Sequence, residues 1–492
     1  MNGTLHTVDI AVLGGYAVVL IFMGITYYRK SKTSTQFMVA DRTIPAWAAG
    51  LAVMSAYTSS ISYIATPGKA FDDNWHPMIF ALCIPPIAFA VNKFVIPYYR
   101  KMKMISVYQF LEERLGAYGR IYAAFSFVLY MIGRVAVILY LASLLLYSFV
   151  PWNMTFIIVL IGIITIVYTM LGGMEAVIWT DVMQSAIMII GILFCAGSLT
   201  YAVFARPDYL IQEAFDAHKF NLGSLDLSLT SRTVWVMIIY GLTENLRNLI
   251  ADQNYVQKYA SVGTEAEAKR SVWIAMLIYI PLTAVFLYIG TALYAYYSPG
   301  GAELGAEITK GDQVFPYYIA TQLPIGLKGL IIAAILAAAM STVDSALNCS
   351  ATVLLLDFYQ RYFNPRVSEK TSVVILRGTS LLWGVLGILF AVLMIRAKSA
   401  LDVWWQISGI FGGGILGLFL LALFRARLQV WQGLFSVALS IGLITWGTFA
   451  RNLPESMSWL ECTIDPILMG ALGTAGLLLT ATVFHLINRV NT

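Results

Sequence analysis

Oxygen-bearing side chains crowd one short segment in the second half of the chain, directly after the alanine run 337–339. They are Ser341, Thr342, Asp344, Ser345 and Asn348. In a helix, positions 341, 345 and 348 share one face and 344 lies beside it. Hydroxyl and carboxylate oxygens suit a small, hard cation, whereas thiolate or imidazole ligands would indicate a transition metal. The segment therefore predicts an alkali-cation site; the alternative is a face of small residues that packs against another helix.

A second cluster, of hydroxyl groups, lies in the apolar stretch 50–71 and fills four of the five positions 58–62. Its members are Thr58, Ser59, Ser60 and Ser62, and Pro67 follows them. Such hydroxyls compete with the backbone for helical hydrogen bonds, so the cluster predicts a local break in this helix. Unwound backbone at membrane depth is tolerated where it lines a cavity. We therefore expect a binding site beside the break, unless the small residues serve close helix packing.

Charged residues inside apolar stretches are costly, so each of them indicates a site or a partner. Arg134 lies near the middle of the stretch 121–149, from which its side chain cannot easily reach an interface. Its planar guanidinium matches a carboxylate and predicts a clamp for an anionic substrate. The equally weighted alternative is a buried ion pair with an acid such as Asp181 or Glu244. Glu244 itself lies three positions before Arg247, and these two can neutralise each other.

These residues must be positioned by helices in a membrane, because the composition is that of an integral membrane protein. Of 492 residues, 59% are hydrophobic and 12% are charged, against roughly 25% charged in soluble domains. The four cysteines are far apart in the sequence, which excludes a disulfide framework or a zinc site. Neither a His–carboxylate nor a Cys–His arrangement lies at membrane depth, so an enzyme is not expected.

Thirteen apolar stretches are long enough to cross the bilayer, which takes about 20 residues of helix. They are 8–27, 46–66, 76–98, 121–149, 154–171, 179–203, 233–251, 271–297, 326–355, 373–396, 403–424, 429–450 and 464–486. The first is too long for a signal peptide and lacks a small-residue cleavage site, so we expect it to be retained. The sequence thus predicts an all-α, multi-pass protein of the inner or plasma membrane.

The Lys and Arg residues of the loops set the predicted orientation. If the N-terminus is outside, most of them fall on the cytoplasmic side, including Lys258 after the seventh stretch. We therefore expect an external N-terminus and a cytoplasmic C-terminus, on opposite sides as an odd number of spans requires. Topology also accounts for the net charge of +5, so a nucleic-acid partner is not expected.

Four motifs together resemble the sodium:solute symporter family, and the similarity extends over nearly the whole chain. They are AAMSTVDSALN at 338–348, MLGGMEAVIWTDV at 170–182, DQNYVQKY at 252–259 and the run at 50–71. The resemblance implies a LeuT-like core of two inverted five-helix repeats, 46–203 and 233–424. It also implies a peripheral helix and link at 1–45, an extracellular loop at 204–232 and two peripheral helices within 425–492.

The resemblance further implies where sodium, as the coupling ion, would bind. A first sodium would take the carbonyls of Ser55, Thr58 and Ala338 and the hydroxyls of Ser341 and Thr342. A second sodium, found in some branches, would lie among Asp181, Asp344 and Ser345. A hydroxyl residue is usual at position 344, so the aspartate either strengthens sodium binding or carries a proton in its place.

The stretch IGRVAVILYL around Arg134 is most similar to the sialic acid carriers of this family, whose arginine meets the substrate carboxylate. The other residues implied to bind substrate are Thr58, Ser59, Ser60, Ser62 and Asn245. Ala81 departs from the pattern, because these carriers place a substrate-contacting glutamine there. Sialic acid is the leading expectation, followed by another carboxylate such as a monocarboxylate or sugar acid, and then by a neutral sugar.

The expected function is sodium-coupled import of a small carboxylated solute by alternating access. Sodium drives such a cycle only if it binds the two states differently, which ligands split between separating helices provide. Two sodiums with one monoanion would move net charge inward. A rival is a proton-coupled carrier with Asp344 or Asp181 as the proton site. A sensor or channel is disfavoured, since neither a kinase module nor a repeated pore-loop motif is found.

Overall fold

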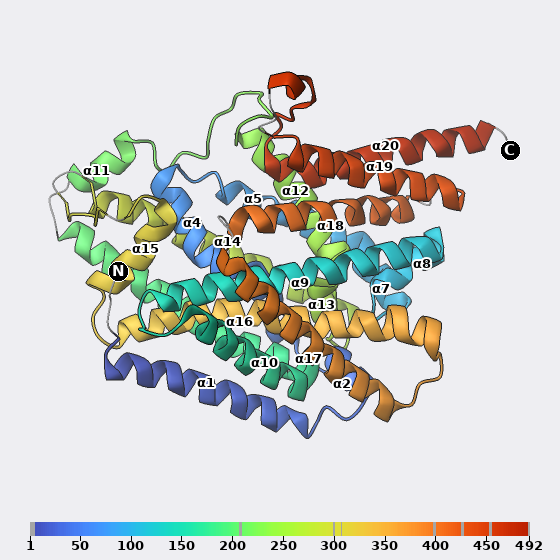
Figure 1. Ribbon diagram of the computed structural model, residues 1–492, viewed down its shortest axis with the longest axis horizontal. Helices are drawn as coiled ribbons and strands as arrows, with labels where there is room; N and C mark the ends of the chain where they lie inside the picture. The colour runs from blue at the N-terminus through green and yellow to red at the C-terminus, as the bar shows by residue number, and fades with distance from the viewer. Residues whose placement is uncertain are drawn as a thin grey trace.

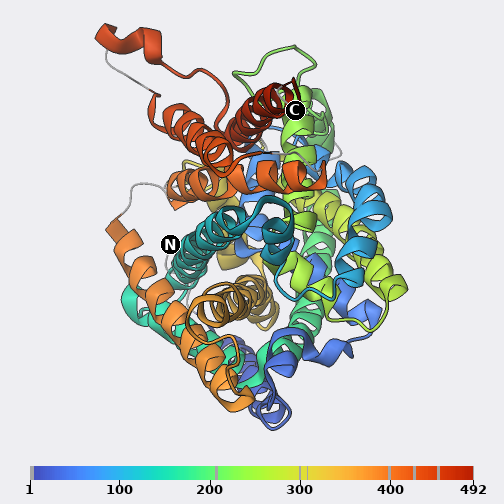
Figure 2. The same ribbon diagram turned by 90° about the vertical axis from the view of Figure 1, so that its right-hand side faces the viewer.

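The computed structural model describes residues 5–205, 209–298, 301–306, 308–396, 400–424, 428–451 and 455–490. Over these residues the chain is helical, and its β-pairing is limited to an isolated bridge between Ile44 and Val262. Most of the long helices run along the long axis of the molecule in Figure 1, and many are seen nearly end-on in Figure 2. The all-α prediction is confirmed.

The described residues form twenty α-helices. In chain order they are α1 (Thr7–Tyr28), α2 (Ser34–Val39), α3 (Ala46–Tyr57), α4 (Ser60–Asp72), α5 (Met78–Leu82), α6 (Ile84–Ala90), α7 (Ile96–Lys101), α8 (Tyr108–Leu115), α9 (Ala117–Tyr147), α10 (Met154–Phe204), α11 (Tyr209–Asp216), α12 (Val234–Ile250), α13 (Gln253–Ala260), α14 (Glu265–Tyr296), α15 (Gly311–Gln322), α16 (Leu327–Val353), α17 (Glu369–Leu393), α18 (Ala400–Leu423), α19 (Val430–Phe449) and α20 (Met469–Val490). The π-helical segments η2 (Val91–Val95) and η3 (Leu354–Phe363) continue α6 and α16. The remaining short segments are 3-10 helices: η1 (Ala40–Arg42), η4 (Met394–Arg396), η5 (Glu455–Leu460) and η6 (Pro466–Leu468).

Each predicted apolar stretch overlaps a helix. Within the described ranges, nine helical segments are long and apolar enough to cross a membrane. The stretches 154–171 and 179–203 are joined as α10, which bends at Gly173, where φ is +62°. A Cβ at this position would lie 2.9 Å from the Cα of Phe37. Both the left-handed backbone and the close approach therefore require glycine at the bend.

The helix α16 forms the centre of the bundle, in contact with α1, α3, α9, α10 and α17. Every residue from Ile331 to Val353 is buried. The outer helices α1, α17 and α19 instead present exposed Val, Leu, Phe and Trp side chains, as expected where a helix faces lipid. The candidate cation residues of α16 therefore lie in the buried centre of the molecule.

The two ends of the bundle differ in which short helices they carry. In Figure 1, α11 and α15 lie at one end of the long axis, and α7 and α8 lie at the other; we call these the α15 end and the α8 end. α1 starts at the α15 end and α20 finishes at the α8 end. Parts of four predicted segments lie outside the described residues: 1–4 in 1–45, 206–208 in the loop 204–232, 299–300, 307 and 397–399 in 233–424, and 425–427, 452–454 and 491–492 in the C-terminal pair.

Candidate functional site

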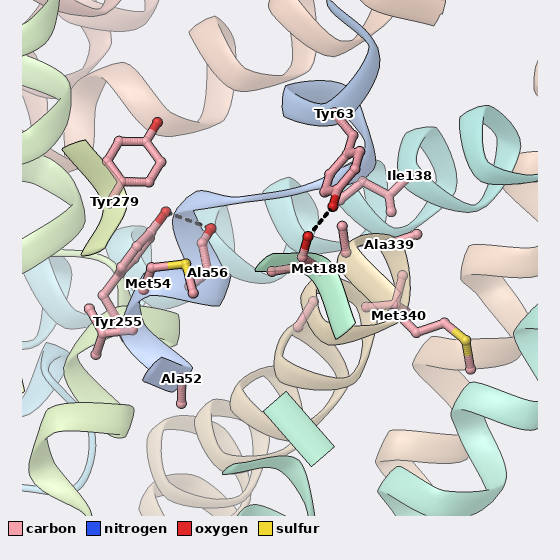
Figure 3. Packing of buried hydrophobic residues seen from close by; sticks show 14 of the residues in the cluster. Ala52, Met54, Ala56, Tyr63, Ile138, Met188, Tyr255, Tyr279, Ala339 and Met340 are labelled. Atoms are coloured by element: carbon pink, nitrogen blue, oxygen red, sulfur yellow. Dashed lines mark hydrogen bonds between the residues drawn. The ribbon is translucent and has the colours of Figure 1, made fainter. Parts of the chain in front are cut away.

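The predicted break lies between α3 and α4. Thr58 and Ser59 have extended backbones, with φ −105° and ψ 100° at Thr58 and φ −105° and ψ 176° at Ser59. The Ser62 hydroxyl accepts from the Ser59 backbone N–H at 3.4 Å and so helps to start α4. In Figure 3 the chain runs as an extended strip between the two helices. The broken helix is confirmed. The last carbonyls of α3, those of Ala56 and Tyr57, accept from side chains instead of from a following helical turn.

A second break, which the sequence analysis did not predict, separates α12 from α13. The carboxylate of Asp252 accepts from the Asn254 N–H at 2.9 Å and caps α13. All eight residues of α13 are buried. The signal in the sequence was the polar run 252–258, whose composition is also that of a loop.

A cavity of about 310 Å³ lies beside the first break. Its polar and aromatic lining includes Tyr57, Ser59, Ser62, Phe80, Tyr130, Arg134, Tyr240, Glu244, Arg247, Tyr255 and Tyr279. Towards the α15 end its walls continue to Lys69, His76 and Arg232. The cavity therefore reaches from the centre of the bundle to the α15 end. The aromatic walls could not be predicted from the sequence, because aromatic residues are common throughout the apolar stretches.

Arg134 lies on the wall of this cavity and is 8% exposed. Its Nη2 donates to the carbonyl of Ala56 at 3.1 Å. The Tyr255 hydroxyl donates to the same carbonyl at 3.0 Å, and Figure 3 shows it pointing at the end of α3. In the described part of the chain, no carboxylate forms an ion pair with this guanidinium. Arg134 is thus held by a neutral carbonyl while its charge borders the cavity.

The ion pairs considered as alternatives for Arg134 are wrong. Asp181 pairs instead with Lys258, with Oδ2 and Nζ 2.9 Å apart. Glu244 pairs with Arg247, which confirms the mutual neutralisation expected from their spacing. A further buried carboxylate, that of Asp252 at the start of α13, interacts electrostatically with Arg134 without forming an ion pair. The anion clamp stays a prediction.

The other residues predicted to bind substrate divide into two groups. Ser59 and Ser62 line the cavity. Thr58, Ser60, Ala81 and Asn245 are instead fully buried and lie behind its wall. The Asn245 amide donates to the carbonyls of Phe80 and Gly241 at 3.0 and 2.7 Å, which ties α12 to α5.

The hydroxyls predicted to bind the first sodium lie together on α16. Ser341 and Thr342 both donate to the carbonyl of Ala338, at 3.2 and 3.1 Å, and all three are fully buried. Ser55 and Thr58 lie on the end of α3, which packs against α16. The structure thus brings oxygen atoms from two adjoining segments to one buried region.

Two buried carboxylates lie in the same region. Asp344 accepts from the Tyr168 hydroxyl at 2.8 Å and from the Ser345 hydroxyl at 3.1 Å. Asp181 accepts from the Ser55 hydroxyl at 3.1 Å. Both are fully buried, and each interacts electrostatically with the other. The predicted second-cation residues are therefore neighbours in the structure.

Lys258 was expected in a cytoplasmic loop, and that expectation is wrong. Its side chain is fully buried on α13, and its Nζ donates to the Ala52 carbonyl at 2.9 Å in addition to pairing with Asp181. A buried ammonium without a partner would be very costly, so the carboxylate of Asp181 explains why this lysine can lie inside the bundle.

Comparison with known proteins identifies the architecture. The model of the sodium:solute symporter family matches residues 37–439. The chain belongs to this family. It is a multi-pass membrane carrier rather than an enzyme, and sodium is its coupling ion, as predicted.

Individual relatives extend over nearly the whole length. The sodium/sialic acid symporter NanT of Aliivibrio fischeri is 31% identical over 473 residues, which cover 95% of this chain and 92% of NanT. A solved Na+-coupled sialic acid symporter in a substrate-bound, outward-open state superimposes with a TM-score of 0.91 at 28% identity, over 98% of both chains. Mhp1, a nucleobase-cation-symport-1 family transporter, shares the fold alone, with a TM-score of 0.53 at 15% identity over 91% of this chain and 95% of Mhp1. The fold is therefore the expected LeuT-like one.

Proposed function

We propose that this carrier imports sialic acid together with sodium, and that Arg134 binds the carboxylate of the sugar. The observation that carries the proposal is the charge of the cavity wall. Lys69, Arg232 and Arg247 each pair with an acid, namely Asp73, Asp465 and Glu244. Arg134 forms no ion pair with an acid among the described residues, and Asp252, with which it interacts electrostatically, is not part of the cavity lining. Its guanidinium fork matches a carboxylate. The NanT relative and the solved symporter are both named for this substrate.

The remaining lining residues suit a hydroxyl-rich ring. Ser59 and Ser62 would offer hydroxyl groups from the broken helix, and the rings of Tyr57 and Tyr279 would pack against the sugar. Pockets of this kind combine apolar walls with a few placed polar groups. Thr58, Ser60, Ala81 and Asn245 would act from behind the wall by fixing its shape.

Sodium would bind where α3 meets α16. Its ligands would be the carbonyls of Ser55, Thr58 and Ala338 and the hydroxyls of Ser341 and Thr342. Because these come from two segments, a bound sodium would hold the end of the broken helix against α16. If that contact loosens when the cavity opens at the α8 end, sodium favours the state open at the α15 end. Asp181, Asp344 and Ser345 form the second candidate cation position, and its occupant decides the number of sodiums.

The proposed topology places the cavity on the outer side of the membrane. We infer thirteen spans with the N-terminus outside and the C-terminus inside, so that the α15 end and the cavity face outwards. The inferred repeats are 46–203 and 233–424, preceded by 1–45, separated by the loop 204–232 and followed by 425–492. Support comes from the two breaks, since α3–α4 and α12–α13 are the first helices of the two segments. Broken helices at equivalent places are typical of inverted repeats.

The test is uptake into proteoliposomes. An inward sodium gradient is expected to drive accumulation of N-acetylneuraminic acid, and the neutral methyl ester is expected not to compete. A monocarboxylate and a hexose serve as the other members of the panel. Uptake that persists without sodium and follows a pH gradient would contradict sodium coupling. Equal competition by acid and ester would contradict the role of Arg134.

A further inference from the structure

We propose that the ammonium group of Lys258 occupies the second cation position, so that each substrate is coupled to a single sodium. The inference rests on the proposed sodium-coupled function and concerns its stoichiometry. It assigns to a residue of the chain the place that a second sodium would take.

The geometry around Asp181 is the first argument. The Lys258 Nζ lies 2.9 Å from the Asp181 Oδ2 and donates to the Ala52 carbonyl at 2.9 Å. The other carboxylate oxygen, Oδ1, accepts from the Ser55 hydroxyl at 3.1 Å. The anionic ligand that a second sodium would need is therefore already in contact with a cation. That cation is attached to the chain and stays with the protein throughout the cycle.

The charge balance of the buried region is the second argument. Asp181, Asp344 and Lys258 are all fully buried and interact electrostatically. Two carboxylates against one ammonium leave a single negative charge. Since Lys258 is bound to Asp181, this charge would lie on Asp344 when both carboxylates are ionised; the partners of Asp344 are the hydroxyls of Tyr168, Thr180 and Ser345.

One sodium is enough to complete this balance. Asp344 lies three residues after Ser341 on α16, a spacing at which side chains are neighbours, so a sodium at the first site would neutralise the region. A second sodium would leave an uncompensated positive charge in the buried centre of the bundle, and burying such a charge is costly. The lysine is placed for this role by α13, which packs against both α3 and α16.

Flux measurements on the wild-type protein in proteoliposomes test the inference. Radiolabelled sodium and N-acetylneuraminic acid are expected to enter in equal amounts. One sodium with one monoanion carries no net charge, so an inside-negative potassium diffusion potential is expected to leave the rate unchanged. Twice as much sodium as substrate, with uptake stimulated by the potential, would overturn the inference. Failure of the proposed function would look different, because no sodium-dependent uptake would occur at all.

Variants of the lysine sharpen the test. Lys258→Met removes the ammonium and keeps most of the side-chain length. It is expected to raise the ratio of sodium to substrate from one to two and to make uptake sensitive to the potential. Lys258→Arg keeps the charge and should keep the ratio. Lys269→Met is the matched control, because Lys269 pairs with Glu265 on a partly exposed helix surface at 2.6 Å. A transporting Lys258→Met protein with an unchanged ratio would overturn the inference, and if this variant does not fold, the wild-type ratio decides.

Discussion

The cavity and the buried region of α16 lie against the same broken helix, yet they differ in access and in charge. The cavity is open towards the α15 end and contains the guanidinium of Arg134. The region around Asp344 is fully buried and contains an excess of carboxylate. Two consecutive residues connect them: the Ser55 hydroxyl donates to Asp181, and the next carbonyl, that of Ala56, accepts from Arg134. The end of α3 therefore separates a place for an anion from a place for a cation.

This arrangement offers a physical route for coupling. A substrate carboxylate at Arg134 would compete with the Ala56 carbonyl for the guanidinium. Any movement of that carbonyl would also displace the preceding residue, Ser55, whose own carbonyl is a proposed sodium ligand. Coupling between two ligands needs such a difference in interaction between states. The two places should nevertheless respond separately to mutation.

The largest effect is expected at Arg134. Arg134→Ala removes the charged partner of the substrate carboxylate, and losing one member of a buried charged pair costs roughly 2–5 kcal/mol. Substrate affinity at saturating sodium should therefore fall by about 30-fold or more, while sodium binding is retained. Isothermal titration of N-acetylneuraminic acid measures the loss.

Lys69→Ala is the matched control for Arg134, since Lys69 lines the same cavity but pairs with Asp73 at 3.4 Å. Its effect should stay within about twofold, because exposed pairs contribute little. Full affinity in Arg134→Ala would instead point to a neutral solute.

A smaller effect is expected from substitutions on α16, and it should alter sodium binding rather than substrate binding. Ser341→Ala and Thr342→Ala each remove one proposed sodium ligand, and a hydrogen bond or similar contact to a charged group contributes about 1.5–3 kcal/mol. Half-maximal uptake should then need roughly tenfold more sodium, with unchanged substrate affinity once sodium is saturating. Ser350→Ala is the control, a buried serine further along the same helix. If neither variant alters the sodium dependence, the first site lies elsewhere.

The sequence predicted those parts of the two places that depend on local pattern. The break at Thr58 and Ser59 was predicted because four nearby hydroxyls can replace backbone hydrogen bonds. The pairing of Glu244 with Arg247 was predicted because residues three apart share a helix face. The oxygen cluster on α16 could be found for the same reason.

What escaped prediction depends on contacts between distant segments. The segment 252–260 is polar enough to resemble a cytoplasmic loop, yet as α13 it is buried, because its polar groups meet others from elsewhere in the chain. Gln257 donates to Asn348 at 2.9 Å, and Lys258 donates to Ala52. The hydropathy of one segment contains no information about such partners from distant parts of the chain. The carbonyl that holds Arg134 is likewise 78 positions away in sequence.

The two ends of the bundle differ in the same way. The α15 end contains the cavity, whereas at the α8 end ion pairs and hydrogen bonds of charged side chains join the helices. Asp357 accepts from the Arg120 Nε and from the Ser106 hydroxyl, each at 2.6 Å, and Arg120 also pairs with Glu112 at 2.6 Å. These contacts join α8, α9 and η3.

Asp357→Asn is expected to weaken closure of the α8 end. A loss of about 1 kcal/mol from the state open at the α15 end lowers its population relative to the opposite state by roughly fivefold. The apparent substrate affinity measured from the α15 side should fall by up to that factor. Glu113→Gln, at an exposed position of α8, should have no effect. Unchanged affinity in Asp357→Asn would show that these pairs do not bias the two states.

The smallest effect is expected at His76, which precedes α5 and borders the cavity. Burial lowers the pKa of His76 to about 4, Asp73 opposes the shift, and Arg232 and Lys69 add to it. The imidazole is therefore neutral between pH 5.5 and 8, and His76→Gln should leave the pH profile of uptake unchanged.

The stability of the protein should instead depend on His76, because a histidine in the unfolded chain binds protons below its ordinary pKa of about 6.5. Between pH 6.5 and 4 the unfolded state takes up more protons, so the contribution of neutral His76 is present above pH 6.5 and is lost as the pH falls. The thermal midpoint of His76→Gln should thus decline less between pH 7 and 5 than that of the wild type. A change in the uptake profile near pH 6 would show that His76 is hydrated and titrates at the mouth of the cavity.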